Sequence, residues 1–150
     1  MTHEPCGPSG RIAARLAKQV ERALSGVDLS VSQYRLLAYL SEGPSQASTL
    51  AERLIVSRPS VTALADGLVE RGLVSRRGAE GDRRRVMHVL TDNGLKELSS
   101  ADEAIERMLG KLANRLTESQ AKRAFNGLDA WGKALDAAID AALADVVKPA

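Results

Sequence analysis

Hydrophobic residues recur at helical spacing along most of the chain. In residues 11–25 a large apolar side chain falls at every fourth position, which places the set on one face of a helix that Gly26 is suited to end. A second helix is predicted for the segment LSVSQYRLLAYL, where Ser30 and Gln33 have the spacing of a capping box. A Gly-Pro pair soon afterwards ends this helix.

A short helix, a tight turn and a longer helix follow. Residues 48–54 predict the short helix, with Thr49 and Glu52 again at capping-box spacing. Residues 55–57 suffice only for a turn, and Ser57 is a good N-cap for the next helix. These are the dimensions of a helix-turn-helix motif, whose second helix enters the major groove of DNA with its first residues. The buried stripe of that second helix is predicted at Val61, Leu64, Leu68 and Val69.

The free face of this second helix supplies candidate DNA contacts. Arginine can pair with guanine, hydroxyl groups can bond to bases or phosphates, and a methyl group can touch thymine. The N–H groups of the first helical turn also favour a phosphate. The residues left on the free face are Arg58, Pro59, Ser60, Thr62, Ala63 and Asp66.

The pattern changes after Gly72. Residues 73–77 and 85–90 predict the strands of a β-hairpin, and residues 78–81 predict its turn. Residues 57–90 hold seven arginines against four acidic residues, a net charge of +3, and arginine suits phosphates and base edges better than lysine does. A basic hairpin directly after the second helix is what a wing needs to reach the minor groove. The arginines of this hairpin are Arg76, Arg77, Arg83, Arg84 and Arg85.

Two other hairpin residues have candidate roles. Asp82 precedes Arg84 by two positions, and in an extended turn its carboxylate can hold that guanidinium in one orientation. His88 shares a strand face with Val86 and Leu90. The main interpretation of His88 is a half-buried histidine with one hydrogen bond, and a pH or metal role is the alternative.

The rest of the chain is predicted to be helical nearly to its end. Apolar residues follow a 3-4 heptad spacing from Leu95 to Leu116, interrupted only by Asp102. Thr117 and Gln120 then form another capping box, at the start of a last helix. The last helix is expected to bury Phe125, Leu128, Leu135 and Ile139 on one side.

The fold class predicted from these elements is mainly α with a small β-hairpin wing. Residues 30–91 form a winged helix-turn-helix lobe, residues 11–29 and 92–147 form a helical dimerisation lobe, and residues 1–10 form a flexible tail. The two lobes are expected to make one compact unit. Two DNA half-sites one helical turn apart require a two-fold dimer.

Composition narrows the functional class. Aromatic residues make up only 3% of the chain, which favours helices over sheets. There is no apolar run long enough to span a membrane and no signal-peptide layout, so a cytoplasmic protein is expected. The single cysteine, Cys6, cannot form an internal disulfide. The sequence has no phosphate-binding loop, metal cluster or nucleophile–histidine pair, so neither an enzyme nor a cofactor is expected.

Residues 10–145 resemble the MarR family of bacterial transcription regulators. The resemblance is carried by LSVSQYRLLAYL, by LAERLIVSRPSVTALADGLVERGLVSR and by DRRRVMHVLTDNG, which matches the family's wing signature of Asp-x-Arg, a short strand and Leu-Thr. It implies a homodimer that binds pseudo-palindromic DNA, usually as a repressor. It also implies release by a small phenolic or other lipophilic ligand, or by oxidation.

The resemblance assigns roles to residues. Asp82 and Arg84 would be the wing pair, with Arg84 in the minor groove, while Ile55 departs from the glycine that the family's turn often has. Cys6 lacks a tyrosine partner in the first helix, which weighs against a peroxide sensor. The recognition-helix contacts would be Ser57, Arg58, Pro59, Ser60 and Thr62.

The resemblance also places an effector pocket between the two lobes, lined by the first, second and fifth helices. Tyr34, Tyr39 and Met108 are candidate ligand-binding residues, with core packing as the alternative role of each. The expected partners are double-stranded DNA, a second copy of the chain and a small effector. The alternative function is a winged-helix interaction module that binds a protein partner, or DNA without sequence preference.

Overall fold

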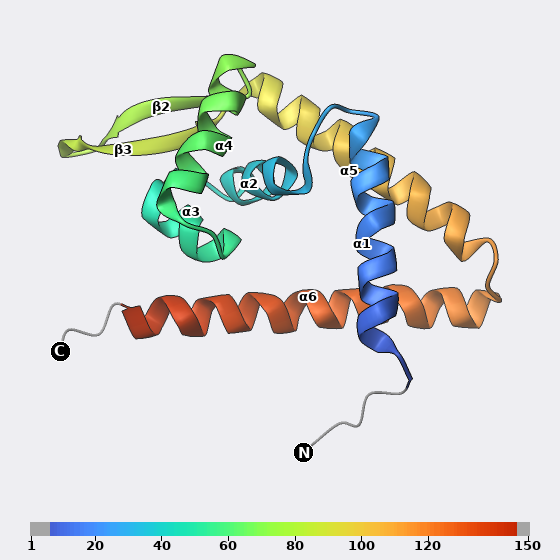
Figure 1. Ribbon diagram of the computed structural model, residues 1–150. Coiled ribbons are helices and arrows are strands. Elements are labelled where there is room, and N and C mark those ends of the chain that lie inside the picture. Colours follow the sequence, from blue (N-terminus) through green and yellow to red (C-terminus); the bar gives the residue numbers. More distant parts are fainter. Residues whose placement is uncertain (1–6, 147–150) are drawn as a thin grey trace.

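The computed structural model describes residues 7–146, which form six helices and a three-stranded sheet. In chain order the elements are α1 (Ser9–Ser25), α2 (Val31–Ser41), β1 (Ser45–Gln46), α3 (Ala47–Leu54), α4 (Arg58–Glu70), β2 (Val74–Ala79), β3 (Asp82–Leu90), α5 (Asp92–Ala113) and α6 (Glu118–Val146). The predicted class, mainly α with a small hairpin, is confirmed. Figure 1 shows α2, α3, α4 and the sheet gathered into one lobe, called here the hairpin lobe, from which α5 leads away. Cys6 lies outside the described residues.

Two predicted helix starts have different outcomes. The capping box of α2 is confirmed, because Ser30 Oγ accepts a hydrogen bond from the Gln33 backbone N–H (3.1 Å) and Gln33 Oε1 accepts one from the Ser30 N–H (3.0 Å). The prediction of a capping box at Thr49 is wrong. Helix α3 begins at Ala47, and its N-cap residue Gln46 makes no capping hydrogen bond through its side chain. The helix starts early because β1 pairs with β3 and delivers the chain directly into its first turn.

The sheet has the order β1-β3-β2, with antiparallel neighbours. The hairpin is longer than predicted, because Gly78 lies within β2, where it pairs with Val86. A register shift follows between Gly78 and Ala79, and Gly81 takes a φ of 80° in the turn. The two-residue strand β1, which was not predicted, places Ser45 opposite His88.

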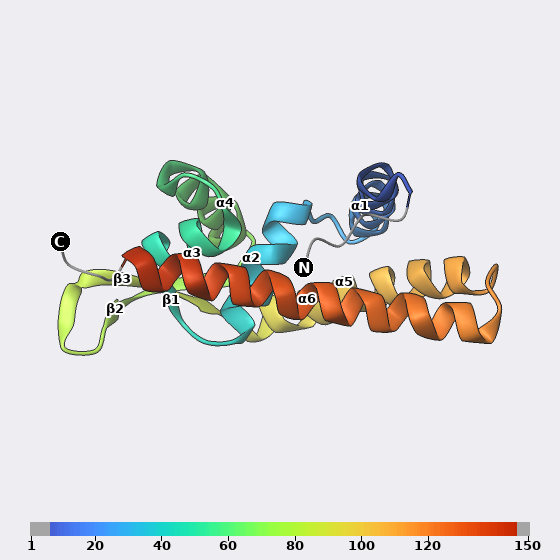
Figure 2. The ribbon, with the colours of Figure 1, turned by 90° about the horizontal axis from the view of Figure 1, so that it is seen from below.

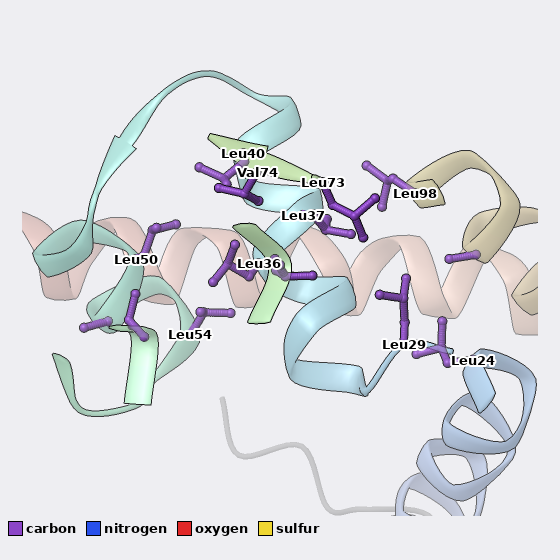
Figure 3. Close-up of a cluster of buried hydrophobic side chains, with 14 residues drawn as sticks. Leu24, Leu29, Leu36, Leu37, Leu40, Leu50, Leu54, Leu73, Val74 and Leu98 are labelled. Atoms are coloured by element: carbon purple, nitrogen blue, oxygen red, sulfur yellow. The ribbon is translucent and has the colours of Figure 1, made fainter. Parts of the chain in front are cut away.

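The hydrophobic core lies around α2. Leu36, Leu37 and Leu40 of this helix are buried among side chains from the neighbouring elements (Figure 3). The predicted stripe of α4 is confirmed at Val61 and Leu68, which are fully buried. The other buried members of this core are Leu24, Leu29, Leu50, Ala51, Leu54, Leu73, Val74, Leu98 and Ala101.

The end of the hairpin is fastened to the start of α5. Thr91 Oγ1 donates a hydrogen bond to the Gly72 carbonyl (2.7 Å) and accepts one from the Gly94 N–H (3.0 Å). The Thr91 backbone N–H donates to the Leu73 carbonyl (3.1 Å). Gly94 is buried, and a Cβ atom there would overlap the Leu73 carbonyl oxygen and lie 2.6 Å from Leu90 Cδ1. Only glycine therefore fits this close approach of α5 to the strands.

The last helix does not bury its predicted face within the chain. Phe125, Leu128 and Leu135 are all exposed, although Ile139 is half-buried, so the described residues of this chain do not by themselves bury the predicted face. Figures 1 and 2 show α6 as a long rod whose C-terminal end returns toward α3, which it contacts. The apolar heptad residues of α5 are also only partly buried by the described residues of this chain. Leu98 is buried near the start of the helix, whereas Leu112 near its end is exposed.

Candidate nucleic-acid interface

Helices α3 and α4 are joined by the predicted three-residue turn. Ile55 ends α3 in the left-handed conformation, with φ 57° and ψ 52°. Such backbone angles cost a β-branched residue about 1–2 kcal/mol relative to its preferred conformations. Ser57 then caps α4, and its Oγ accepts a hydrogen bond from the Ser60 N–H at 3.2 Å. The chain thus enters α4 in a fixed direction through a strained turn.

The first turns of α4 present a polar face to solvent. Ser57 and Ser60 lie with their Oγ atoms 2.8 Å apart, and Thr62 Oγ1 donates to the Arg58 carbonyl at 3.2 Å. The predicted contacts Pro59 and Ala63 are exposed on the same stretch of helix. All six predicted contacts between Ser57 and Ala63 are exposed. The motif therefore offers an uncovered helix start with one arginine at its first position.

The hairpin projects from the hairpin lobe beside α4 (Figure 1). Arg83, Arg84 and Arg85 are exposed on β3, near the turn, and Arg77 is exposed on β2. Exposed arginines at the tip of a hairpin are suited to a narrow groove with negative potential.

Asp82 organises this tip differently from the prediction. Its Oδ1 accepts a hydrogen bond from the Arg84 backbone N–H (3.0 Å), and its Oδ2 lies 3.6 Å from Arg85 Nε. The carboxylate therefore fixes the backbone at Arg84 and pairs with Arg85. It does not hold the Arg84 guanidinium, which leaves that group exposed for a ligand.

Arg76 connects the wing to α4. Its guanidinium forms an ion pair with Asp66 of α4, through Nη2 and Oδ1. Its Nε also donates to His88 Nε2 on the neighbouring strand, at 3.4 Å. From the sequence, Asp66 was expected on a free helix face and Arg76 among the DNA contacts. The signal that it lacked is the strand register, which sets Arg76 opposite His88 and next to the helix.

His88 is buried at 4% exposure, more deeply than the predicted half-buried position. Burial lowers the pKa of His88, and the positive charge of Arg76 lowers it further, against the opposing effects of the Ser45 backbone and of Asp66. Its Nδ1 has no well-aligned hydrogen-bond partner in the described part of the chain. In this arrangement Nε2 is the acceptor for the Arg76 guanidinium.

Comparison with known proteins identifies the family. A family model described as "MarR family" matches residues 27–85. The HTH-type transcriptional regulator FarR of Neisseria gonorrhoeae is 33% identical over 112 residues, which are 68% of this chain and 77% of FarR. The HTH-type transcriptional repressor IacR of Pseudomonas putida is 28% identical over 114 residues, 75% of this chain and 68% of IacR.

This chain belongs to the MarR family. It is a DNA-binding transcription regulator of the winged helix-turn-helix type, in a family that is not enzymatic. Solved structures agree on the fold. MarR of E. coli in its apo form has a TM-score of 0.72 at 21% identity, over 85% of this chain and 97% of MarR. CouR of Rhodococcus jostii RHA1, bound to p-coumaroyl-CoA, has a TM-score of 0.65 at 22% identity, over 79% and 85%.

The three predicted ligand-binding residues of this MarR-family chain are not brought together. Tyr34 donates a hydrogen bond to Asp102 Oδ1 on α5. Tyr39 lies beneath Arg53, whose Cζ is 5.3 Å from the ring centroid. Met108 lines a separate groove between α1 and α5.

That α1–α5 groove is an open hollow with a volume of about 690 Å³. Its lining includes the apolar side chains Met108 and Leu112 among polar and charged ones. No carboxylate is among its lining residues. Its four cationic side chains are Arg22, Arg107, Lys111 and Arg115.

Residues 7–146 were compared with the requirements of a metal site and of a membrane-spanning helix. These residues contain no group of three or more histidine, cysteine, aspartate or glutamate side chains placed to hold a metal ion. None of their helices is both long enough and apolar enough to cross a membrane.

Proposed function

We propose that this MarR-family regulator is a homodimeric repressor, which binds a pseudo-palindromic operator and leaves it when a small ligand binds. The observation that carries the proposal is the apolar face of α6, which the described part of the chain leaves uncovered. The name of IacR, a repressor, supports the direction of regulation.

The uncovered face favours a second copy as its partner. Phe125, Leu128, Trp131 and Leu135 follow one another at intervals of three or four residues, so they share one side of the helix. Trp131 is 71% exposed. Burial of such side chains stabilises by about 1.5–3 kcal/mol each, which gives a strong drive to association. A two-fold dimer would also supply the second recognition helix that a palindrome needs.

DNA contacts are divided between α4 and the wing. Arg58, Ser60 and Thr62 are the proposed base-reading residues in the major groove, beside the ring methylenes of Pro59 and the methyl group of Ala63. Ser57 and the free N–H groups of the first turn of α4 would hold a phosphate.

The wing would contact the adjacent minor groove. Arg84 is the proposed groove residue because its guanidinium is exposed and its backbone is fixed by Asp82. Arg77, Arg83 and Arg85 would contact the phosphate backbone. Arg76 acts through its ion pair with Asp66 and holds the wing in place, which refines its predicted role as a direct contact.

The α1–α5 groove is the proposed effector site. Its four cations and apolar side chains suit an anionic ligand with an apolar part. CouR, which is bound to p-coumaroyl-CoA, gives one example of such a molecule in a structure of this fold. A ligand there would release DNA if it bound more tightly to a dimer whose half-site spacing does not fit the operator.

Selection of bound fragments from the host genome, followed by sequencing, tests the DNA proposal. We expect one palindromic motif, bound in the nanomolar range and much more tightly than random duplexes at about 0.15 M salt. Arg84→Ala should lose about 1–3 kcal/mol of operator affinity, whereas Lys133→Ala on α6 should lose none. Equal affinity for the motif and for random DNA would overturn the repressor proposal in favour of a non-specific or protein-binding module.

Sedimentation tests the dimer. Trp131→Glu places a charge on the uncovered face and should shift the protein toward monomer, with weaker binding to the palindrome. Lys133→Glu, two residues away on a polar part of the helix, is the matched control. A wild-type protein that sediments as a monomer at all concentrations would contradict the proposal.

A further inference from the structure

Ile55 combines two unfavourable features. Its backbone is in the left-handed region, with φ 57°, and its side chain is 80% exposed, more than any other large hydrophobic residue described. The other described non-glycine residue with positive φ is Asp28. Aspartate tolerates this conformation, and the Asp28 carbonyl is held by Arg71 Nη1 at 2.8 Å. Isoleucine has neither advantage.

The left-handed turn at Ile55 is closed by backbone hydrogen bonds, from the Val56 N–H to the Ala51 carbonyl (3.0 Å) and from the Ile55 N–H to the Glu52 carbonyl (3.2 Å), which glycine or asparagine would make equally well. Leu54 before it is buried, at 2% exposure, and Val56 after it is half-buried. The Ile55 side chain therefore adds no core contact that would offset the strain of its backbone. Strained residues of this kind are concentrated where a ligand or partner is bound.

The position of Ile55 points to the ligand. It lies two residues before the N-cap Ser57, and it shares a surface hollow with Ser57 and Arg58. In a helix-turn-helix motif the second helix enters the major groove by its first residues. A side chain in the same hollow as those residues would lie beside DNA bound in this way.

We infer that Ile55 is an apolar DNA contact, which packs against a thymine methyl or a deoxyribose next to the group bound by Arg58. The inference rests on the proposed binding of an operator. Both targets are apolar groups of DNA, so an aliphatic side chain would recognise either by excluding water. The contact would add affinity without neutralising a phosphate.

Operator affinity and thermal stability of Ile55 variants test this contact. Ile55→Asn keeps a residue that tolerates the left-handed conformation but removes the apolar side chain. We expect its unfolding temperature to equal or exceed that of the wild type and its operator affinity to fall about fivefold or more. Ile55→Val should retain most of the affinity. Leu95→Asn, which alters an exposed leucine of α5, should bind as the wild type does.

The salt dependence separates a contact from a loosened turn. An apolar contact releases no counterions, so the slope of log K against log salt should be the same for Ile55→Asn and the wild type. Arg83→Ala, at a proposed phosphate contact, is the reference and should lower the slope. If Ile55→Asn binds as the wild type does, or if its slope falls as in Arg83→Ala, the inference is wrong.

The two DNA targets are distinguished by replacing thymines of the operator with uracil, which lacks the methyl group. A loss in the wild type that is absent in Ile55→Asn identifies a thymine methyl. Loss of hydroxyl-radical protection in Ile55→Asn, without any uracil effect, identifies a deoxyribose. All variants are also measured on a random duplex. If the wild type binds both duplexes equally, the repressor proposal fails, while the Ile55 comparison is still read on the random duplex.

Discussion

The hydroxyl group of Tyr34 on α2 donates a 2.7 Å hydrogen bond to Asp102 Oδ1 on α5, 68 residues later in the chain. This contact explains why an aspartate interrupts the apolar heptads of α5. Burial of the ring raises the pKa of Tyr34, as do the hydrogen bond to Asp102 and the charges of Asp102 and Glu106. The bond ties the hairpin lobe to the helix that leads away from it.

Tyr34→Phe should therefore lower the free energy of unfolding by about 1 kcal/mol, the usual contribution of one hydrogen bond. Chemical denaturation measures the change. Tyr39→Phe is the matched control, since the Tyr39 hydroxyl makes no hydrogen bond within the described residues, and it should be close to neutral. Equal stability of Tyr34→Phe and the wild type would show that water replaces the bond without cost.

Gly94→Ala should destabilise the protein by about 3 kcal/mol, the upper end of the usual cost of overpacking. The added methyl would meet the Leu73 carbonyl, a backbone group that cannot move without shifting the strand, and the Leu90 side chain. Thermal unfolding measures the effect. Gly110→Ala on the same helix is the control, because a Cβ there meets nothing within 4 Å, and it should preserve or raise stability. Similar melting of the two variants would contradict the packing described for Gly94.

Stability should fall as the pH falls below about 6.5, the ordinary pKa of histidine. Because the pKa of His88 is lowered in the folded protein, the unfolded chain binds a proton at a higher pH than the folded chain does. The stabilisation is therefore complete above the unfolded pKa and is lost as the pH falls through the folded one. Denaturation at a series of pH values measures this, with His88→Gln as the comparison. An equally steep loss in His88→Gln would assign the effect to other groups.

Asp66→Ala should change global stability by less than about 1 kcal/mol, because its ion pair with Arg76 is partly exposed to solvent. The wing, however, loses its attachment to α4. Hydrogen exchange in β2 and β3 should therefore become faster, and operator affinity should fall although Asp66 contacts no DNA. Glu103→Ala, which breaks the exposed pair with Arg107, should leave the hairpin unchanged. Unaltered exchange in Asp66→Ala would show that the ion pair does not hold the wing.

Local patterns in the sequence predicted most of the fold. The helices of the hairpin lobe were recognisable because their caps and apolar stripes lie within a few residues of one another, as at Ser30 and Ser57. The strand β1 could not be recognised, since two residues show no periodicity and form a strand only by pairing with β3, where Ser45 lies opposite His88. The ion pair of Arg76 with Asp66 could not be predicted either, because it also joins residues that are distant in the sequence. Contacts of this kind depend on register and not on sequence spacing.

The exposed face of α6 illustrates a second limit. Its apolar spacing predicted a buried face, and the helix was assigned to the dimerisation lobe, but the spacing did not indicate which chain buries each residue. A periodic apolar pattern shows that one face of a helix is buried, but it does not show whether the same chain or a partner buries it. For the site, spacing selected the exposed residues of α4 and the wing, while the αL strain at Ile55 required backbone angles.

The contacts of Thr91 and Gly94 join the start of α5 rigidly to the end of the hairpin, so the two elements are expected to rotate together. The helix has 22 residues, so it is about 33 Å long at about 1.5 Å per residue. Its first turn is fixed to the base of the hairpin, without an intervening loop that could absorb motion. A rotation of about 5° at the wing therefore corresponds to a displacement of about 3 Å at the far end of α5, where the α1–α5 groove lies. If α5 moves as a rigid rod, a small displacement at that groove would therefore change the direction in which the hairpin projects.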